Sequence, residues 1–203
     1  MSPLASPQLE LSSRQLSAAA ENIAAAQFSL YGFDVLEQAG QARFVYDLGV
    51  AKSGGMMKVM VHGSLDGFWE LVEPYLERTP RHAPTKADYH RAIDLWLEHH
   101  DCRVACCLVK FESADLLNMP RLYLASASEV AEKLHEITEH VGATVLCEEY
   151  ERTDAHGGRC TESLSAKWRF SQTRITELMR RQKGEQVPFR FAAAGRECAQ
   201  MVN

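Results

Sequence analysis

The sequence predicts a single α/β domain, and three observations lead to this fold class. The 203-residue chain alternates between the apolar spacing of amphipathic helices and the short apolar runs of strands. It has no Pro-, Gly- or Ser-rich linker that would divide it, and its length is sufficient for one sizeable core. Hydrophobic residues make up 46% and charged residues 24%, as in ordinary globular domains.

The first third of the chain predicts a helix followed by an antiparallel meander. The helix is expected over 14–30, with Ser12 or Ser13 as its N-cap and Gly32 just beyond its end. Three strands are expected to follow it, over 33–38, 44–51 and 56–62. The turn at 53–55 contains two glycines, which suit the positive φ angles of a tight hairpin. The next stretch, 65–77, has only a weakly helical spacing that Pro74 interrupts.

The rest of the chain predicts further alternation of helices and strands. Ser126 and Glu129 have the spacing of a capping box, so a helix is expected to begin there and to continue to about His140. The apolar run at 103–111 is typical of a strand buried on both faces. The other expected elements are a helix over 85–99, strands over 121–125 and 144–148, a polar loop over 154–161, and a helix from Ser171 to about Gln182 with its arginines opposite the apolar face.

Charge separates a core region, 1–166, from a basic helical extension, 167–203, that is expected to pack on the same domain. The chain has a net charge of −5, but 167–196 holds eight basic and two acidic residues, a charge of +6 that leaves −11 for the remainder. Three arginines of the final helix are the candidate contacts for a polyanion: Arg174, Arg180 and Arg181. A run of charge on a helix is also typical of a solvated face.

The sequence carries no signal for a membrane or for a structural metal centre. No apolar run reaches the roughly 18 residues that span a bilayer, and the first ten residues do not resemble a secretion signal. The six cysteines form no CxxC pair, and His90, His99 and His100 match no known metal motif. Reduced cysteines in a chain of this kind indicate a cytoplasmic protein.

A second pattern lies in the order of the polar residues. Glu21 belongs to the first helix, Asp47 to the second expected strand, and Lys58 and His62 to the strand that returns from the hairpin. Together with 32–35, 59–64 and 118–125, this order resembles the PD-(D/E)XK nuclease superfamily in its restriction-endonuclease-like and resolvase-like forms, over residues 18–135. The resemblance implies a mixed central sheet flanked by helices.

The resemblance also implies a Mg²⁺ or Mn²⁺ site in which two acidic groups hold the cation and a lysine stabilises charge. Asp47 matches the central aspartate of the family and Glu21 its helix glutamate. The third motif departs from the family, because Met60 stands where an acidic residue or glutamine is usual and His62 stands where lysine is usual. Lys58, two side chains back along the same strand face, is the other candidate for the role of that lysine.

Two functions follow from these residues, and a third interpretation is a plain α/β interaction protein whose resemblance to the family is accidental. The first is metal-dependent hydrolysis of DNA, with Glu21 and Asp47 as metal ligands and Lys58 or His62 as the catalytic cation. The second is a catalytically inactive nuclease-like fold that binds nucleic acid or a protein. Each residue also has an ordinary structural interpretation: a solvated helix glutamate, a hairpin lysine, a hydrogen-bonded core histidine. The pattern leaves both a monomer and a homodimer open.

Overall fold

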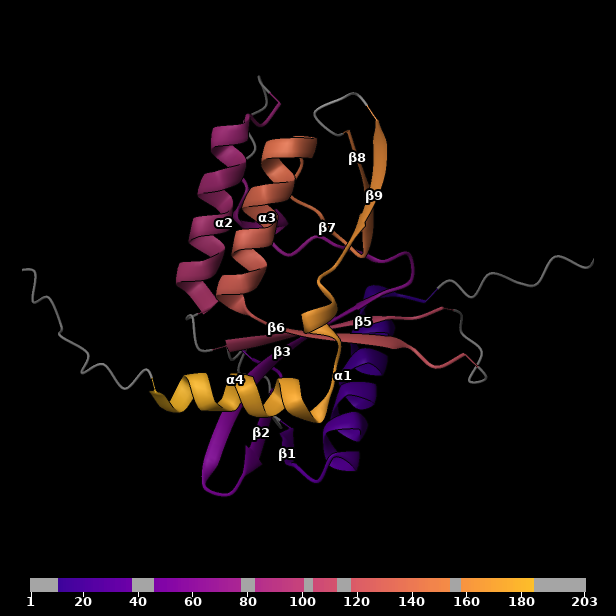
Figure 1. Cartoon of the computed structure of the whole chain (residues 1–203), viewed down its shortest axis with the longest axis vertical. Helices are drawn as coiled ribbons and strands as arrows, with labels where there is room; N and C mark the ends of the chain where they lie inside the picture. The colour runs from indigo at the N-terminus through magenta and orange to yellow at the C-terminus, as the bar shows by residue number, and fades with distance from the viewer. Residues whose placement is uncertain are drawn as a thin grey trace, which may run out of the picture.

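The computed structural model describes residues 11–37, 46–77, 83–100, 104–112, 118–153 and 158–184. It confirms the α/β class, with a mixed five-stranded sheet flanked by helices (Figure 1). In spatial order the sheet consists of β1 (Asp34–Glu37), β2 (Leu48–Lys52), β3 (Gly55–Ser64), β5 (Val104–Lys110) and β6 (Arg121–Ser126). Neighbouring strands are antiparallel except β3 and β5, which are parallel and are joined by a helical crossover.

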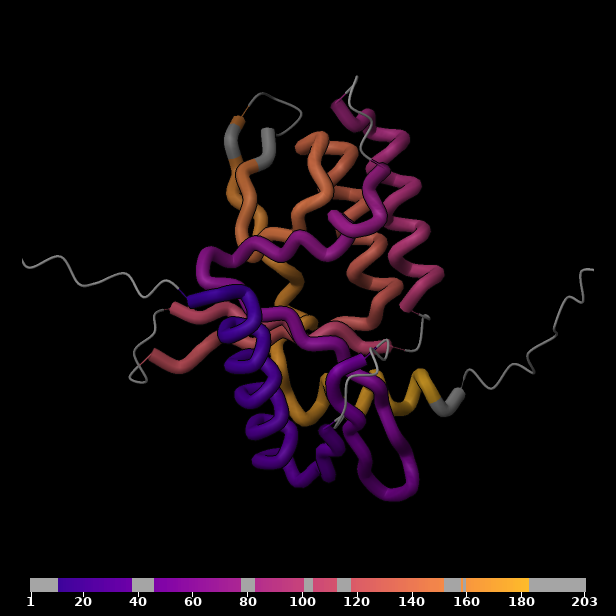
Figure 2. The backbone as a smooth tube through the Cα atoms, turned by 180° about the vertical axis from the view of Figure 1, so that it is seen from behind, coloured from indigo at the N-terminus to yellow at the C-terminus, as the bar shows by residue number. Residues whose placement is uncertain are grey.

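Helices cover both faces of this sheet, as the front and back views show (Figure 1 and Figure 2). One face carries α1 (Ser13–Leu30) and α4 (Gln172–Gly184), and the other carries α2 (Lys86–His100) and α3 (Ala127–Val141). β3 separates the two cores, because Met57, Val59 and Val61 pack with α1 and α4 while Met60 packs with α2 and α3. This is the alternation that the sequence predicts for β3.

Local signals fix the ends of α1 and the hairpin. Ser12 caps α1 through a capping box with Gln15, and Gly32 follows the helix with φ of 75°. Ser53 and Gly54 have φ of 52° and 75°, and they return β3 antiparallel to β2 as expected. The strand expected over 44–51 begins later, at Leu48, so Asp47 precedes β2 rather than lying within it; residues 44 and 45 lie outside the described residues.

Two regions differ from the sequence prediction. The stretch expected to be weakly helical forms β4 (Phe68–Trp69) and a short 3₁₀ helix at Glu73–Tyr75. β4 pairs with β7 (Leu146–Cys147), which is shorter than the strand expected over 144–148. Beyond it, β8 (Glu149–Thr153) and β9 (Arg159–Ser163) form a hairpin that the sequence did not predict. The loop expected over 154–161 is therefore wrong at 159–161, which belong to β9, while 154–157 lie outside the described residues.

The basic extension expected over 167–203 is described as far as residue 184. It begins within a second 3₁₀ helix, Ala166–Trp168, and continues through α4, which contacts β3 and β6. The remaining residues of the extension, 185–203, lie outside the described residues. None of the helices in the described ranges combines the length and the hydropathy that a membrane span requires.

Candidate functional site

Asp47 lies at the point where β2 begins and where β3 continues alone beside β5. Its main-chain N–H donates to the carbonyl of Val59, and its Oδ2 accepts a hydrogen bond of 2.7 Å from the N–H of Val61. Burial raises the pKa of the Asp47 carboxyl, whereas the Val61 hydrogen bond and the nearby His100 oppose that rise. The carboxylate therefore completes the β2–β3 ladder and leaves Oδ1 for another partner.

Glu21 projects from α1 close enough to Asp47 for the two charges to interact. Burial is the largest cause of a raised pKa at Glu21, followed by the negative charges of Asp47 and Glu37. Within the described ranges Glu21 makes no hydrogen bond or ion pair. The structure thus brings together the two carboxylates that the sequence pattern singled out. It adds Glu37 on β1, which sequence reasoning did not identify because an exposed glutamate at a strand end carries no distinguishing signal.

His62 lies on β3 beyond Val59, which pairs with the first residue of β2. Its Nε2 is sealed from solvent and has no hydrogen-bond partner among the described residues. Burial, and secondarily the charge of His100, lower the pKa of His62 to about 4. The imidazole is therefore neutral at pH 7 and supplies no positive charge to the site.

The other residues of the third motif do not provide a replacement charge within the site. Met60 is only 4% exposed and belongs to the core under α2 and α3. Lys58 is exposed, lies opposite Gly49, and holds its Nζ 5.2 Å from the centre of the Tyr46 ring. In the described part of the chain, Lys58 forms no salt bridge with either Glu21 or Asp47. Tyr46 precedes Asp47 directly, so the Lys58 Nζ lies over the ring of the residue next to Asp47.

An open cleft of about 390 Å³ is lined by His62, but Glu21, Asp47 and Lys58 are not among its lining residues. Its walls come from α1, from the end of β3 and from the segment around β4, and they include Ser17, His62, Asp66 and Glu70. The Trp69 indole N–H closes one wall by donating to the carbonyl of His62 over 3.1 Å. The cleft therefore carries acidic and neutral groups at its walls, and His62 is one of its lining residues.

His100 is a member of this group that sequence reasoning did not select. Its Nδ1 lies 2.8 Å from the carbonyl of Trp96, one turn earlier in α2. Burial lowers the pKa of His100, while the Trp96 carbonyl and Asp47 act in the opposite direction. The sequence presents this residue as an ordinary helix-end histidine, and only the crossover from α2 to β5 places it near Asp47.

These residues match part of the metal site that the resemblance implies. Glu21 and Asp47 are hard oxygen ligands whose mutual repulsion a bound cation would reduce. Met60 contributes only a buried thioether, which is a poor ligand for Mg²⁺. Among the residues that the structure describes, no three His, Cys, Asp or Glu side chains converge as a metal-binding group. The carboxylate half of the site fits a divalent cation, and the third motif does not.

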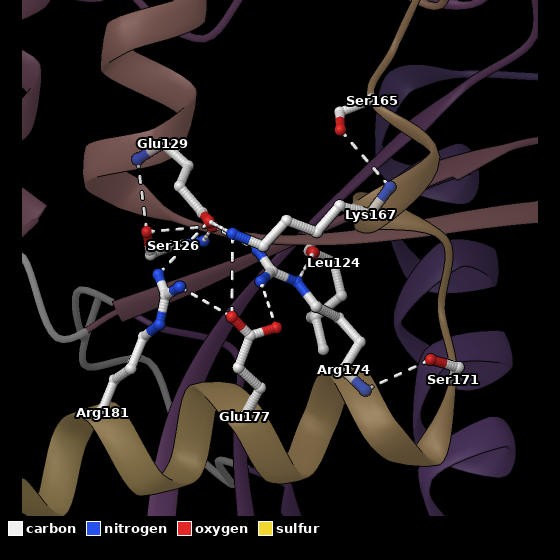
Figure 3. Close-up of polar contacts among 9 residues, drawn as sticks. All are labelled: Leu124, Ser126, Glu129, Ser165, Lys167, Ser171, Arg174, Glu177 and Arg181. Carbon is white, nitrogen blue, oxygen red and sulfur yellow. Dashed lines mark hydrogen bonds and ion pairs between the residues drawn. The ribbon is translucent and has the colours of Figure 1, made fainter.

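The structure gives Arg174 a place different from the expected solvated face. Its side chain is 2% exposed, and it spans from α4 to the carbonyl of Leu124 and to Glu129 and Glu177 (Figure 3). The expectation that the arginines of this helix lie opposite its apolar face is therefore wrong for Arg174. The Arg174 side chain therefore holds α4 against β6 and α3, because its guanidinium N–H groups are paired within the fold.

The neighbouring cations of α4 differ in how far they are paired. Arg181 is half-exposed and bonds Glu129 and Glu177 at 3.3 and 2.6 Å (Figure 3). Arg180 is exposed and lines a groove of about 280 Å³ together with Lys52. The Nζ of Lys52 bonds the carbonyl of Tyr31 and lies over the Phe33 ring. Arg180 and Lys52 therefore form the cationic border of this groove.

Neither a family model, nor a curated protein, nor a solved structure matches the chain. The candidate functions therefore rest on the residues and their geometry.

Proposed function

We propose that the chain is a nuclease-like domain that binds nucleic acid without hydrolysing it. The observation that carries this proposal is the state of His62, which stands at the position of the family's lysine, has a buried Nε2 and is neutral at pH 7. Phosphodiester cleavage places additional negative charge on the phosphate, and a preorganised positive charge normally stabilises it. A neutral imidazole and a buried Met60 do not offer that charge.

The order of elements supports the nuclease-like part of the proposal. A helix that carries Glu21 precedes an antiparallel meander, Asp47 stands at the start of its second strand, and a helix and a parallel strand follow. This is the order on which the resemblance to restriction-endonuclease-like proteins rests. Fold-level likeness is an association, so the inactive state is argued from the site itself.

The nucleic-acid part of the proposal rests on the groove between α4 and the β2–β3 hairpin. Arg180 and Lys52 offer two cations on one border, and the polar side chains of Gln172 and Thr176 line the same groove. Arginine and lysine beside hydroxyl and amide groups suit the phosphate backbone. The cleft near Glu21 and Asp47 is negatively charged, so a polyanion is expected to prefer the groove.

Fluorescence anisotropy with labelled duplex and single-stranded DNA tests the binding part. We expect affinity that falls as salt rises, and weaker binding with a shallower salt dependence in Arg180→Glu and Lys52→Glu. Arg91→Glu is the matched control, because Arg91 is exposed on α2 and, within the described ranges, its one ion pair is a 3.8 Å contact with Glu77. Absence of binding at low salt, or equal effects of all three variants, would remove nucleic acid and direct the search to a protein partner.

The second candidate function is metal-dependent DNA hydrolysis, and the proximity of Glu21 and Asp47 favours it. A bound Mg²⁺ or Mn²⁺ ion would polarise the phosphate and activate water. Glu21 and Asp47 would hold that ion, and Lys58 would have to leave the Tyr46 ring to reach the phosphate.

Incubation of plasmid, linear duplex and single-stranded DNA with Mg²⁺ or Mn²⁺ decides between the two functions. We expect no cleavage by the unmodified chain. Cleavage that Asp47→Ala and Lys58→Ala both abolish, and that Arg91→Ala preserves, would establish the nuclease and refute the non-hydrolytic proposal. Thermal denaturation of each variant verifies that it remains folded.

A further inference from the structure

Two histidines face each other between α2 and α3, which lie side by side in both views of the fold (Figure 1 and Figure 2). The Nδ1 atoms of His90 and His135 are 2.6 Å apart. The ring centres are 4.9 Å apart and the ring planes differ by 19°. The centre separation exceeds the nitrogen separation by about the width of one ring, so the two rings meet edge to edge with their Nδ1 atoms directed at each other.

The outer nitrogen of each ring is held by a carboxylate. The Nε2 of His90 lies 2.8 Å from Glu139, and the Nε2 of His135 lies 3.2 Å from Asp94. Glu139 also lies 3.5 Å from the Nζ of Lys86, so it is shared between a histidine and a lysine.

If each Nε2 donates to its carboxylate, the two neutral rings present Nδ1 lone pairs to each other. Two such lone pairs at this distance are repulsive unless a proton or a metal ion joins them. The pair therefore offers two nitrogen ligands, directed at each other, for a shared cation.

We propose that His90 and His135 bind a divalent transition-metal ion through their Nδ1 atoms, with Zn²⁺, Ni²⁺ and Cu²⁺ as the class of ion. Imidazole nitrogen suits these metals, and a carboxylate on the opposite ring nitrogen is the usual second layer of a histidine metal site. Asp94 and Glu139 fill that second layer here. Water completes the coordination, because the two imidazoles supply two positions.

The geometry requires only a small opening of the pair. With metal–nitrogen distances of about 2.0–2.1 Å and a tetrahedral angle, the two nitrogens stand roughly 3.3 Å apart. Metal binding therefore requires the two Nδ1 atoms to move apart by less than about 1 Å, and rotation of the side chains can supply this movement. The two side chains are 28% and 35% exposed, so an ion reaches them from solvent.

Calorimetric titration and thermal denaturation of the EDTA-treated chain test this site. Ni²⁺ and Zn²⁺ are expected to bind with one ion per histidine pair and to raise the Tm, whereas Mg²⁺ does neither. His90→Asn and His135→Asn each remove this binding event. His140→Asn, an exposed histidine in the last turn of α3, is the matched control and leaves it unchanged. Glu139→Gln weakens binding by roughly tenfold, because it removes an outer carboxylate.

Two results would overturn the proposal. One is a chain that gains no Tm from Ni²⁺ or Zn²⁺, which would mean that the pair shares only a proton. The other is a metal response that persists in both His90→Asn and His135→Asn, which would place the ion elsewhere. If either variant has a low Tm in EDTA, Asp94→Asn and Glu139→Gln provide the test, since both carboxylates are exposed and both rings remain.

Discussion

Two charged regions of this molecule contrast in how their charges are compensated. Where α4 meets α3, two carboxylates are paired with three cations: Glu129 and Glu177 with Arg174, Lys167 and Arg181 (Figure 3). Burial raises the pKa of Glu129, but its hydrogen bonds and the neighbouring cations outweigh burial and lower that pKa to about 2. Near the start of β2, the negative charges of Glu21 and Asp47 repel each other, and the Nε2 of His62 has no hydrogen-bond partner among the residues that the structure describes. The first region stabilises the fold, and the second leaves ligand-binding capacity unused by the fold.

The largest expected effect lies in the compensated region. Arg174→Met should lower the free energy of unfolding by about 3 kcal/mol, because it removes the buried cation that Glu129 and Glu177 share and leaves them only the more exposed Lys167 and Arg181. Arg180→Met, on the exposed face of the same helix, should stay within about 0.5 kcal/mol of the parent chain. Urea denaturation measures both. Equal effects would mean that the burial of Arg174 contributes nothing beyond its position on α4.

Substitution of a second carboxylate that is paired with cations, Glu148, should have a smaller effect on the free energy of unfolding, and this effect depends on pH. Glu148 accepts from Arg121, from Tyr123 and from Lys110, and these contacts bring its pKa to about 2 against the burial that opposes them. At pH 7, Glu148→Gln should cost roughly 1–3 kcal/mol, because three donors lose an ionised acceptor.

The sign of the pH dependence follows from the lowered pKa. The unfolded chain takes up the proton first, so stability is fully present above pH 4.5 and is lost as the pH falls toward 2. Glu148→Gln should flatten this part of the stability profile, whereas Glu132→Gln, an exposed glutamate of α3, should leave it unchanged. A profile that stays equally steep in Glu148→Gln would contradict the assignment.

The cleft should respond in a different pH window. The pKa of His62 is about 4 in the folded chain against an ordinary value of 6.5, so the unfolded chain again binds the proton first. Stability linked to His62 is therefore present above pH 6.5 and is lost as the pH falls toward 4. His62→Leu should remove this slope and, by eliminating the unpaired Nε2, raise stability at pH 7 by about 1 kcal/mol.

A matched substitution separates this effect from histidine loss in general. His140→Leu changes an exposed histidine on α3 and should retain the slope between pH 6.5 and 4. Guanidinium denaturation at several pH values measures both variants. Destabilisation of His62→Leu at pH 7 would mean that the imidazole makes a favourable contact in the fold.

The sequence predicts most of the helices and strands because the signals that specify them are local. The capping boxes at Ser12 and Ser126, the glycine turn after Lys52 and the alternation along β3 each act within a few residues. β4 was missed because two residues carry no periodicity, and its pairing partner lies almost eighty positions later. Short strands of this kind are specified by tertiary contacts and not by propensity.

The polar clusters show the same division between local and distant information. Glu21, Asp47 and His62 could be selected from their order along the chain, although only the structure shows that His62 is neutral and sealed. Arg174 could not be told from Arg180 by sequence, because its partner Glu129 lies 45 residues away. The same holds for His90 and its partner on α3, whose contact depends on how two amphipathic helices pack.

The smallest expected effect measures the electrostatic repulsion between Glu21 and Asp47. Glu21→Gln should stabilise the chain by up to about 0.5 kcal/mol, because it removes one of the negative charges that face Asp47. A double-mutant cycle with Asp47→Asn isolates the interaction, and the coupling should vanish once either charge is gone. Addition of Mg²⁺ should reduce the coupling only if both carboxylates approach one ion. A coupling of zero without metal would place Glu21 outside the site and leave Asp47 as a structural cap of Val61.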